Sequence, residues 1–142
     1  MERIKLSKNF YLDEYIPEGM YHELQFKSHI LIGLLDKRLL NADQKLRNFI
    51  GPVTINNWWN GGERNWSGIR TPDSPFYSRT SQHSWGRASD KIFANVTPQE
   101  VREYIKIHWK KLGVTAIEEN VGWVHSDVRY VKDQKELLLV YP

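Results

Sequence analysis

Apolar residues in the first third of the chain recur at intervals of three and four positions, over residues 22–50. This spacing places them on one face and predicts a long amphipathic helix, or two helices joined end to end. The apolar positions are Leu24, Ile30, Leu31, Leu34, Leu35, Leu39, Leu46 and Phe49. Gly51-Pro52 follows directly and predicts that the helical region ends there.

The clearest helix start in the sequence is Thr97-Pro98-Gln99-Glu100. It combines a threonine cap, a proline at the first helical position and a glutamate that completes a capping box. The helix is predicted to run to Leu112 and to stop at Gly113. Its apolar face, which we expect to pack on the core, consists of Val101, Tyr104, Ile105, His108, Trp109 and Leu112.

Short runs rich in β-branched and aromatic residues predict four strands, separated by turn-forming residues. The runs lie in residues 53–59, 88–96, 120–130 and 136–141. A polar loop follows the first of them, and loops of its length are usually functional or disordered. Helices with a small, mostly antiparallel sheet predict an α+β fold, and no repeat or linker divides residues 1–142 into more than one domain.

Composition narrows the classes of function. The 142 residues include 20 Lys and Arg against 17 Asp and Glu, a net charge of +3 that predicts only weak attraction to nucleic acid. A mildly anionic partner such as a cell-wall polymer fits this charge. No run is long and apolar enough to cross a membrane, and the charged start predicts synthesis in the cytosol without a secretion signal. Because there is no cysteine, a bound metal would need His, Asp or Glu ligands.

Two of the five histidines stand near acidic residues in separate polar segments. His83 precedes Asp90 in a loop where Gly86 allows a tight turn, and His125 shares one face of a predicted strand with Asp127. From the residues alone, these side chains are either metal ligands or ordinary solvated polar groups. His22, His29 and His108 are interpreted as surface or packed histidines.

The order of these motifs resembles a known family. The pattern S-x-H-x-x-G-x-A-x-D runs from Ser81 to Asp90, a later V-H-S-D contains His125, and an upstream S-G-I-R ends at Arg70. Across residues 50–130 the chain resembles the zinc D-alanyl-D-alanine carboxypeptidases and related peptidoglycan peptidases, which share a hedgehog-like fold. Its short length is similar to that of stand-alone members from bacteriophages, which act on the wall after release or as part of the virion.

The resemblance implies a zinc ion held by His83, Asp90 and His125, with a fourth position open to water. It implies that Arg70 binds a substrate carboxylate or steadies the developing oxyanion. Ser81 is expected to orient the ligand loop near the substrate. Trp85 and Trp123 are expected to line the substrate pocket, which would receive the peptide stems of peptidoglycan.

The general base is the point where the chain departs from the family pattern. Many members carry an acid three residues before the last histidine, and that position is Gly122 here. Asp127 and Glu119 are the two acidic candidates, and Asp127 could instead hold a ligand histidine in place. Two functions stay open: a zinc D,D-carboxypeptidase or endopeptidase, and a non-catalytic metal-bearing module of a virion or of wall binding.

Overall fold

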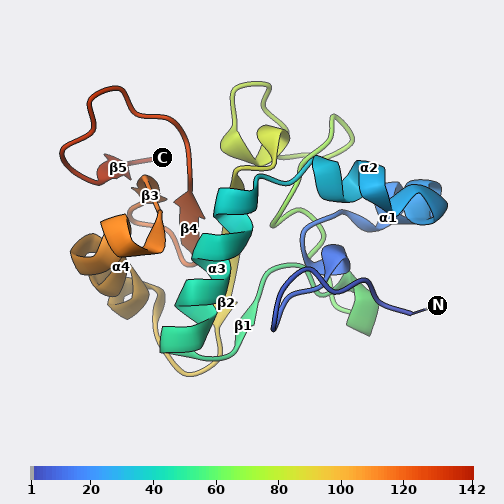
Figure 1. Ribbon diagram of the computed structural model, residues 1–142, viewed down its shortest axis with the longest axis horizontal. Coiled ribbons are helices and arrows are strands. Elements are labelled where there is room, and N and C mark those ends of the chain that lie inside the picture. The colour runs from blue at the N-terminus through green and yellow to red at the C-terminus, as the bar shows by residue number, and fades with distance from the viewer. Residues whose placement is uncertain (1) are drawn as a thin grey trace.

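The computed structural model describes residues 2–142 and has an α+β fold around a five-stranded sheet (Figure 1). Neighbouring strands pair antiparallel, except that the last strand lies parallel to its neighbour. In sheet order the strands are β1 (Val53–Thr54), β2 (Ala88–Phe93), β4 (Val124–Asp127), β3 (Ala116–Glu118) and β5 (Leu138–Val140). The predicted fold class, α+β with a mostly antiparallel sheet, is confirmed.

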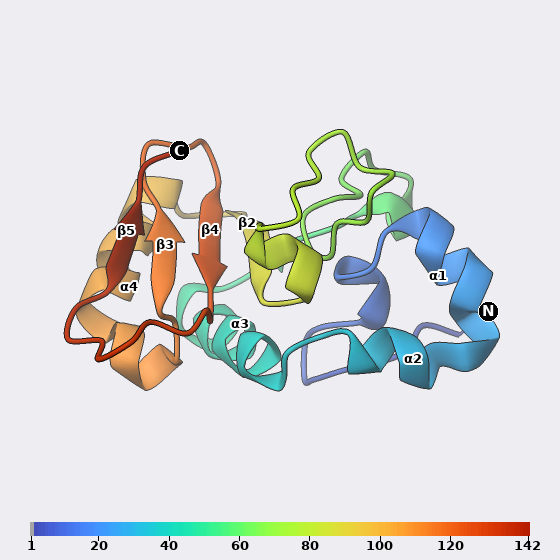
Figure 2. The same ribbon diagram turned by 90° about the horizontal axis from the view of Figure 1, so that it is seen from above.

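The register of β2 against β4 decides which side chains share a face. Asp90 stands opposite His125, and Ser89 stands opposite Ser126. Successive side chains of a strand point to opposite faces, so the two pairs lie on different sides of the sheet. The helices α3 (Lys37–Ile50) and α4 (Pro98–Leu112) pack on the face that carries the serines. Figure 2 shows both helices alongside the strands, with α1 and α2 farther from the sheet.

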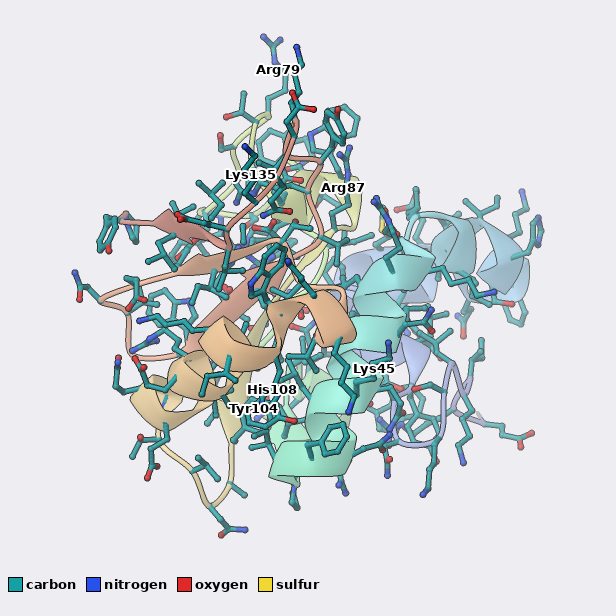
Figure 3. All side chains as sticks on the ribbon, turned by 60° about the vertical axis from the view of Figure 1, so that its left-hand side comes forward. Lys45, Arg79, Arg87, Tyr104, His108 and Lys135 are labelled. Atoms are coloured by element: carbon teal, nitrogen blue, oxygen red, sulfur yellow. The ribbon has the colours of Figure 1, made fainter. Side chains whose placement is uncertain are left out.

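Helix α4 forms as the sequence predicts. The Thr97 side chain accepts a hydrogen bond from Glu100 N–H, the Glu100 carboxylate accepts one from Thr97 N–H, and Gly113 ends the helix in the left-handed region. Val101, Ile105 and Leu112 are buried. His108 is half-buried with its ring 4.4 Å from that of Tyr104. Figure 3 shows both rings on α4, near the side where Lys45 projects from α3.

The N-terminal helical region is divided, contrary to the first of the two predicted arrangements. It consists of α1 (Glu18–Leu24), the 3-10 turn η2 (Gln25–Lys27), α2 (Ser28–Gly33) and α3. The break before α3 arises because Asp36 N–H donates to Gly86 O, while the Asp36 carboxylate caps α3 at Arg38 N–H. The helical region ends at Ile50, as expected. Three predicted core positions are exposed: Ile30, Leu34 and Phe49.

The strand predictions are right in part. Only Val53–Thr54 of residues 53–59 pairs with the sheet, because Trp58–Asn60 turns into the 3-10 helix η3. The turn seats the Trp58 indole in the core, where its N–H donates to Ile16 O. Residues 88–96, 120–130 and 136–141 contain β2, β4 and β5. Strand β3 was not predicted.

A charged network lies under the helix-covered face of the sheet; we call it the core network. Lys91 of β2 and Asp43 of α3 are fully buried with Nζ and Oδ1 3.1 Å apart. Lys91 Nζ also donates to the hydroxyls of Ser89 and Ser126, at 2.7 Å each. Ser89 and Tyr15 donate in turn to Asp43 Oδ2. Each charge is therefore surrounded by protein partners.

No helix among residues 2–142 has both the length and the apolar character to cross a membrane.

Candidate metal centre

Three buried side chains converge on the other face of the sheet: His83, Asp90 and His125. His83 Nε2 lies 3.2 Å from Asp90 Oδ1, and His125 Nδ1 lies 2.9 Å from the same oxygen. One ligand atom from each residue falls within 4.8 Å of the other two. The group, which we call the metal triad, could hold a metal ion. Within residues 2–142 no other His, Asp or Glu group meets this criterion.

His83 is carried by a short 3-10 helix, η4 (Gln82–Trp85), that bends the chain back toward β2. Ser81 caps this helix through its hydroxyl, which accepts a hydrogen bond from His83 N–H at 3.3 Å. Gly86 ends it with a φ of 67°, and a Cβ there would lie 1.9 Å from Leu34 O. Only glycine fits both the backbone conformation and the close approach. The predicted turn between His83 and Asp90 is therefore present, and Ser81 orients the ligand loop.

The tautomer of His83 is set by a backbone carbonyl. Its Nδ1 lies 2.8 Å from Gly68 O, so the Nδ1–H donates there and Nε2 faces Asp90. Gly68 packs closely on the segment before α1, where an added Cβ would lie 2.2 Å from Tyr15 O. A carbonyl that fixes the far nitrogen of a ligand histidine is a common feature of metal sites.

His125 is held from its far side by a carboxylate. Its Nε2 lies 2.8 Å from Asp127 Oδ2, and Arg129 Nε donates to Asp127 Oδ1 at 2.8 Å. Asp127 thus contacts the ring nitrogen that points away from the triad. This is the position of an orienting partner, one of the two roles expected for Asp127.

Burial and hydrogen bonding act in opposite directions on the triad. Burial by itself would lower the pKa of His125, but the hydrogen bonds to Asp127 and Asp90 outweigh it and raise that pKa to about 9. Burial would raise the pKa of Asp90, yet hydrogen bonds from His125 and His83 hold it below its ordinary value. Without a metal the group is an ion pair, so a metal ion would replace a proton on His125.

Arg70 contacts the triad through the outer oxygen of its aspartate. Its Nη2 lies 2.7 Å from Asp90 Oδ2, and its Nε donates to Trp66 O at 2.8 Å. The remaining guanidinium nitrogen, Nη1, has no hydrogen-bond partner among the described residues. Sequence and structure agree that Arg70 lies beside the candidate ligands.

A cavity of about 360 Å³ opens beside Asp90 and Arg70; we call it the site cavity. Aromatic side chains form much of its wall: Trp66, Phe76 and Trp123. Trp123 therefore lies where it was expected. Trp85 does not line this cavity, because its indole turns outward and donates to Arg79 O. Trp66 and Phe76 were not predicted, although they lie on either side of the S-G-I-R segment.

The acidic residue that faces the triad is Glu118, which the sequence did not single out. Its Oε1 lies 3.5 Å from His125 Nδ1. Glu119, the predicted candidate, turns the other way: its carboxylate lies 2.7 Å from Lys106 Nζ and 3.7 Å from Arg102 Nε, both on α4. The two glutamates alternate because they leave β3 in extended conformation. Gly122 lies in the exposed turn before β4.

Comparison with known proteins gave no match among protein-family models, curated proteins or solved structures.

Proposed function

We propose that this protein is a zinc-dependent peptidase that cleaves D-amino-acid peptide bonds of bacterial peptidoglycan, as a D,D-carboxypeptidase or an endopeptidase. The observation that carries the proposal is the convergence of two buried histidines on an aspartate that lines an open cavity. Glu118 and Arg70 stand directly beside them. A carboxylate, a guanidinium and three metal ligands are together the groups that a hydrolytic metal site needs.

The ligand set suits zinc. Imidazole nitrogen and carboxylate oxygen are ordinary zinc ligands, and three protein ligands leave a coordination position free, as in catalytic sites. Zinc held there supplies Lewis acidity toward a carbonyl group and makes a coordinated water more acidic. His83 Nε2, Asp90 Oδ1 and His125 Nδ1 are the atoms that would hold it.

The residues around the metal ligands have separate roles in the proposed reaction. Glu118 accepts the proton of the attacking water, because its carboxylate lies beside His125 and pairs with no lysine or arginine among the described residues. Asp127 keeps the His125 ring in place through Nε2. Arg70 has an unused N–H edge for a substrate carboxylate or a developing oxyanion, since its guanidinium is fixed by Asp90 and Trp66.

The choice of peptidoglycan rests on the motif from Ser81 to Asp90, the V-H-S-D segment and the arginine of S-G-I-R. The site cavity is compatible with a short peptide: aromatic walls contact apolar parts of the stem, while Arg70 offers a partner for a terminal carboxylate.

Glu118→Gln tests the proposal most sharply. The amide keeps the shape of the side chain but cannot take up a proton, so muropeptide release should fall by about a hundred- to ten-thousandfold while zinc stays bound. Glu136→Gln is the matched control, because Glu136 is exposed in the loop before β5. Product masses then separate free D-alanine from cleaved cross-links.

A negative result has a clear meaning. If the zinc-loaded wild type releases nothing from the walls of several bacterial species, the peptidase proposal fails. The non-catalytic metal-bearing module then takes its place.

A further inference from the structure

A second cavity of about 230 Å³ lies between the N-terminal segment and residues 53–60; we call it the amide cavity. None of its lining residues belongs to the metal triad or contacts it. Its walls are polar, with four carboxamides, three charged groups and two aromatic rings: Asn9, Asn56, Asn57, Asn60, Arg3, Asp13, Glu14, Tyr11 and Trp59. Pockets for apolar ligands are lined mostly by hydrophobic side chains, so this cavity suits a different class of molecule.

The amide cavity shares a wall with the site cavity. Asn57 N–H donates to Arg64 O at 3.0 Å, and Asn57 Oδ1 accepts from Arg64 N–H at 2.9 Å. Asn56 Oδ1 accepts from Ser67 N–H at 2.9 Å. The two asparagines line the amide cavity, whereas Arg64 and Ser67 line the site cavity. The two cavities are therefore separated by a single pair of hydrogen-bonded segments.

The one cation of the amide cavity is paired within the protein. Arg3 donates to both oxygens of Asp13, through Nε at 2.9 Å and Nη2 at 2.6 Å. Its guanidinium lies 4.1 Å from the centre of the Tyr11 ring, which holds it further in place. With Asp13 and Glu14 beside the one cation, the cavity has no positive excess to hold a phosphate or another anion.

Several amide groups at the cavity have unused hydrogen-bonding capacity. Among residues 2–142, the Asn60 side chain and Asn57 Nδ2 have no hydrogen-bond partner, and Asn9 uses its oxygen toward Gln44 while its Nδ2 has none. A carboxamide both donates and accepts, so it matches hydroxyl groups that do the same. Trp59, half-buried at the rim, adds an apolar ring for the C–H face of a ligand.

We propose that the amide cavity is a binding site for a neutral saccharide, one sugar unit of which fits between Asn57, Asn60 and Trp59. Neighbouring hydroxyls of a sugar present the paired donors and acceptors that carboxamides recognise, and a neutral sugar places no anionic group beside Asp13 and Glu14. The volume is slightly below the range of roughly 300–1,000 Å³ typical of pockets for drug-sized ligands, which favours a single ring over a longer segment.

This inference goes beyond the proposed peptidase and stands without it, since binding a sugar needs neither the metal nor Glu118. If the proposed function holds, the glycan strand of peptidoglycan is the natural source of the sugar. The shared wall would then bring a bound strand next to the cavity in which its peptide is cut.

The test uses the full zinc-loaded chain with two soluble probes, the β-1,4-linked tetramers of N-acetylglucosamine and of glucose. Isothermal titration should detect binding of at least one tetramer. Asn60→Ala should weaken that binding about three- to tenfold, the cost of losing one hydrogen bond. Asn95→Ala is the matched control, because Asn95 is an exposed asparagine in the turn before α4. It should bind like the wild type.

The location of the sugar is read from the tryptophan side chains by NMR. The indole N–H signal of Trp59 should shift on addition of the tetramer, while that of Trp123 in the site cavity should not. No binding of either tetramer, equal binding by Asn60→Ala, or a shift confined to Trp123 would each overturn the proposal. Muropeptide release is measured separately, so a failed peptidase and a failed saccharide site remain distinguishable.

Discussion

Strands β2 and β4 carry charged side chains to both faces of the sheet, and the two faces use them differently. On the helix-covered face, the core network pairs Lys91 with Asp43 Oδ1 as ions, and serine hydroxyls accept from Lys91 or donate to Asp43 Oδ2. On the other face, the metal triad brings two imidazoles onto a single oxygen of Asp90. Adjacent residues of one strand, Asp90 and Lys91, thus belong to two kinds of buried charge.

The difference lies in what completes each group. The core network pairs a cation with an anion inside the protein, and neither Lys91 nor Asp43 lines the site cavity or the amide cavity. The triad collects atoms that all have lone pairs to offer and lies beside a cavity of about 360 Å³. Converging lone pairs at an accessible place call for a proton or a metal ion between them. A buried charge alone does not indicate a functional site. A functional site is indicated where ligand atoms converge on one point.

The largest effect on stability is expected from Lys91→Met. This change leaves Asp43 buried without its cation, which should cost about 3–5 kcal/mol in the free energy of unfolding. Urea denaturation measures the loss. Adding Asp43→Asn should recover most of it, because the amide still accepts from Tyr15 and Ser89 without a buried charge. A loss under about 1 kcal/mol would show that the core network is not the completed structure described above.

Arg70→Ala should act on turnover rather than on folding. Losing the free guanidinium edge should lower muropeptide release by about a hundredfold, in the range for one oxyanion donor, while the zinc content stays unchanged. The control is Arg79→Ala, an arginine exposed in the neighbouring loop. Unchanged kinetics in Arg70→Ala would reduce Arg70 to a structural partner of Asp90.

Asp127→Asn separates an orienting residue from a base. If Asp127 holds His125 in place, the variant should bind zinc about ten- to a hundredfold more weakly, and saturating zinc should restore the rate. Asp133→Asn, in the exposed loop before β5, serves as the control. A rate that stays low at saturating zinc would instead make Asp127 the proton acceptor and remove that role from Glu118.

The smallest effect concerns Glu14, a titrating carboxyl near the core network. Burial raises the pKa of Glu14 to about 7 against the hydrogen bond from Tyr11 N–H, which lowers it, and the charge of Asp13 adds to the rise. The folded chain then keeps a proton that the unfolded chain loses near pH 4.5. Stability should therefore fall as the pH rises from about 4.5 to 7. Glu14→Gln should flatten this slope in urea titrations; an unchanged slope would contradict the assignment.

Local signals in the sequence predict the local parts of the fold. The capping box and Gly113 fix both ends of α4, because each acts within one turn of the helix. The break before α3 depends on Gly86 O, which is distant in the chain, so spacing alone left a long helix and two joined helices as alternatives. The Asp36 cap was the one local sign of that break.

The candidate site likewise has residues that the sequence predicts and residues that it does not. His83, Asp90, His125 and Arg70 lie in motifs whose residue types are recognisable, and the structure brings them together. The sequence could not favour Glu118 over Glu119. Which of the two faces the triad depends on which residues of β3 point to each side of the sheet, and β3 itself was not predicted. The walls of both cavities come from loops far apart in the sequence.

Zinc content is the most direct test of the metal triad. The purified protein should hold about one zinc ion per chain by elemental analysis, and both His83→Ala and Asp90→Ala should lose it, because two remaining ligands are too few. His29→Ala, an exposed histidine on α2, should keep it. Full zinc occupancy in both triad variants would contradict the assignment of His83, Asp90 and His125 as the metal ligands.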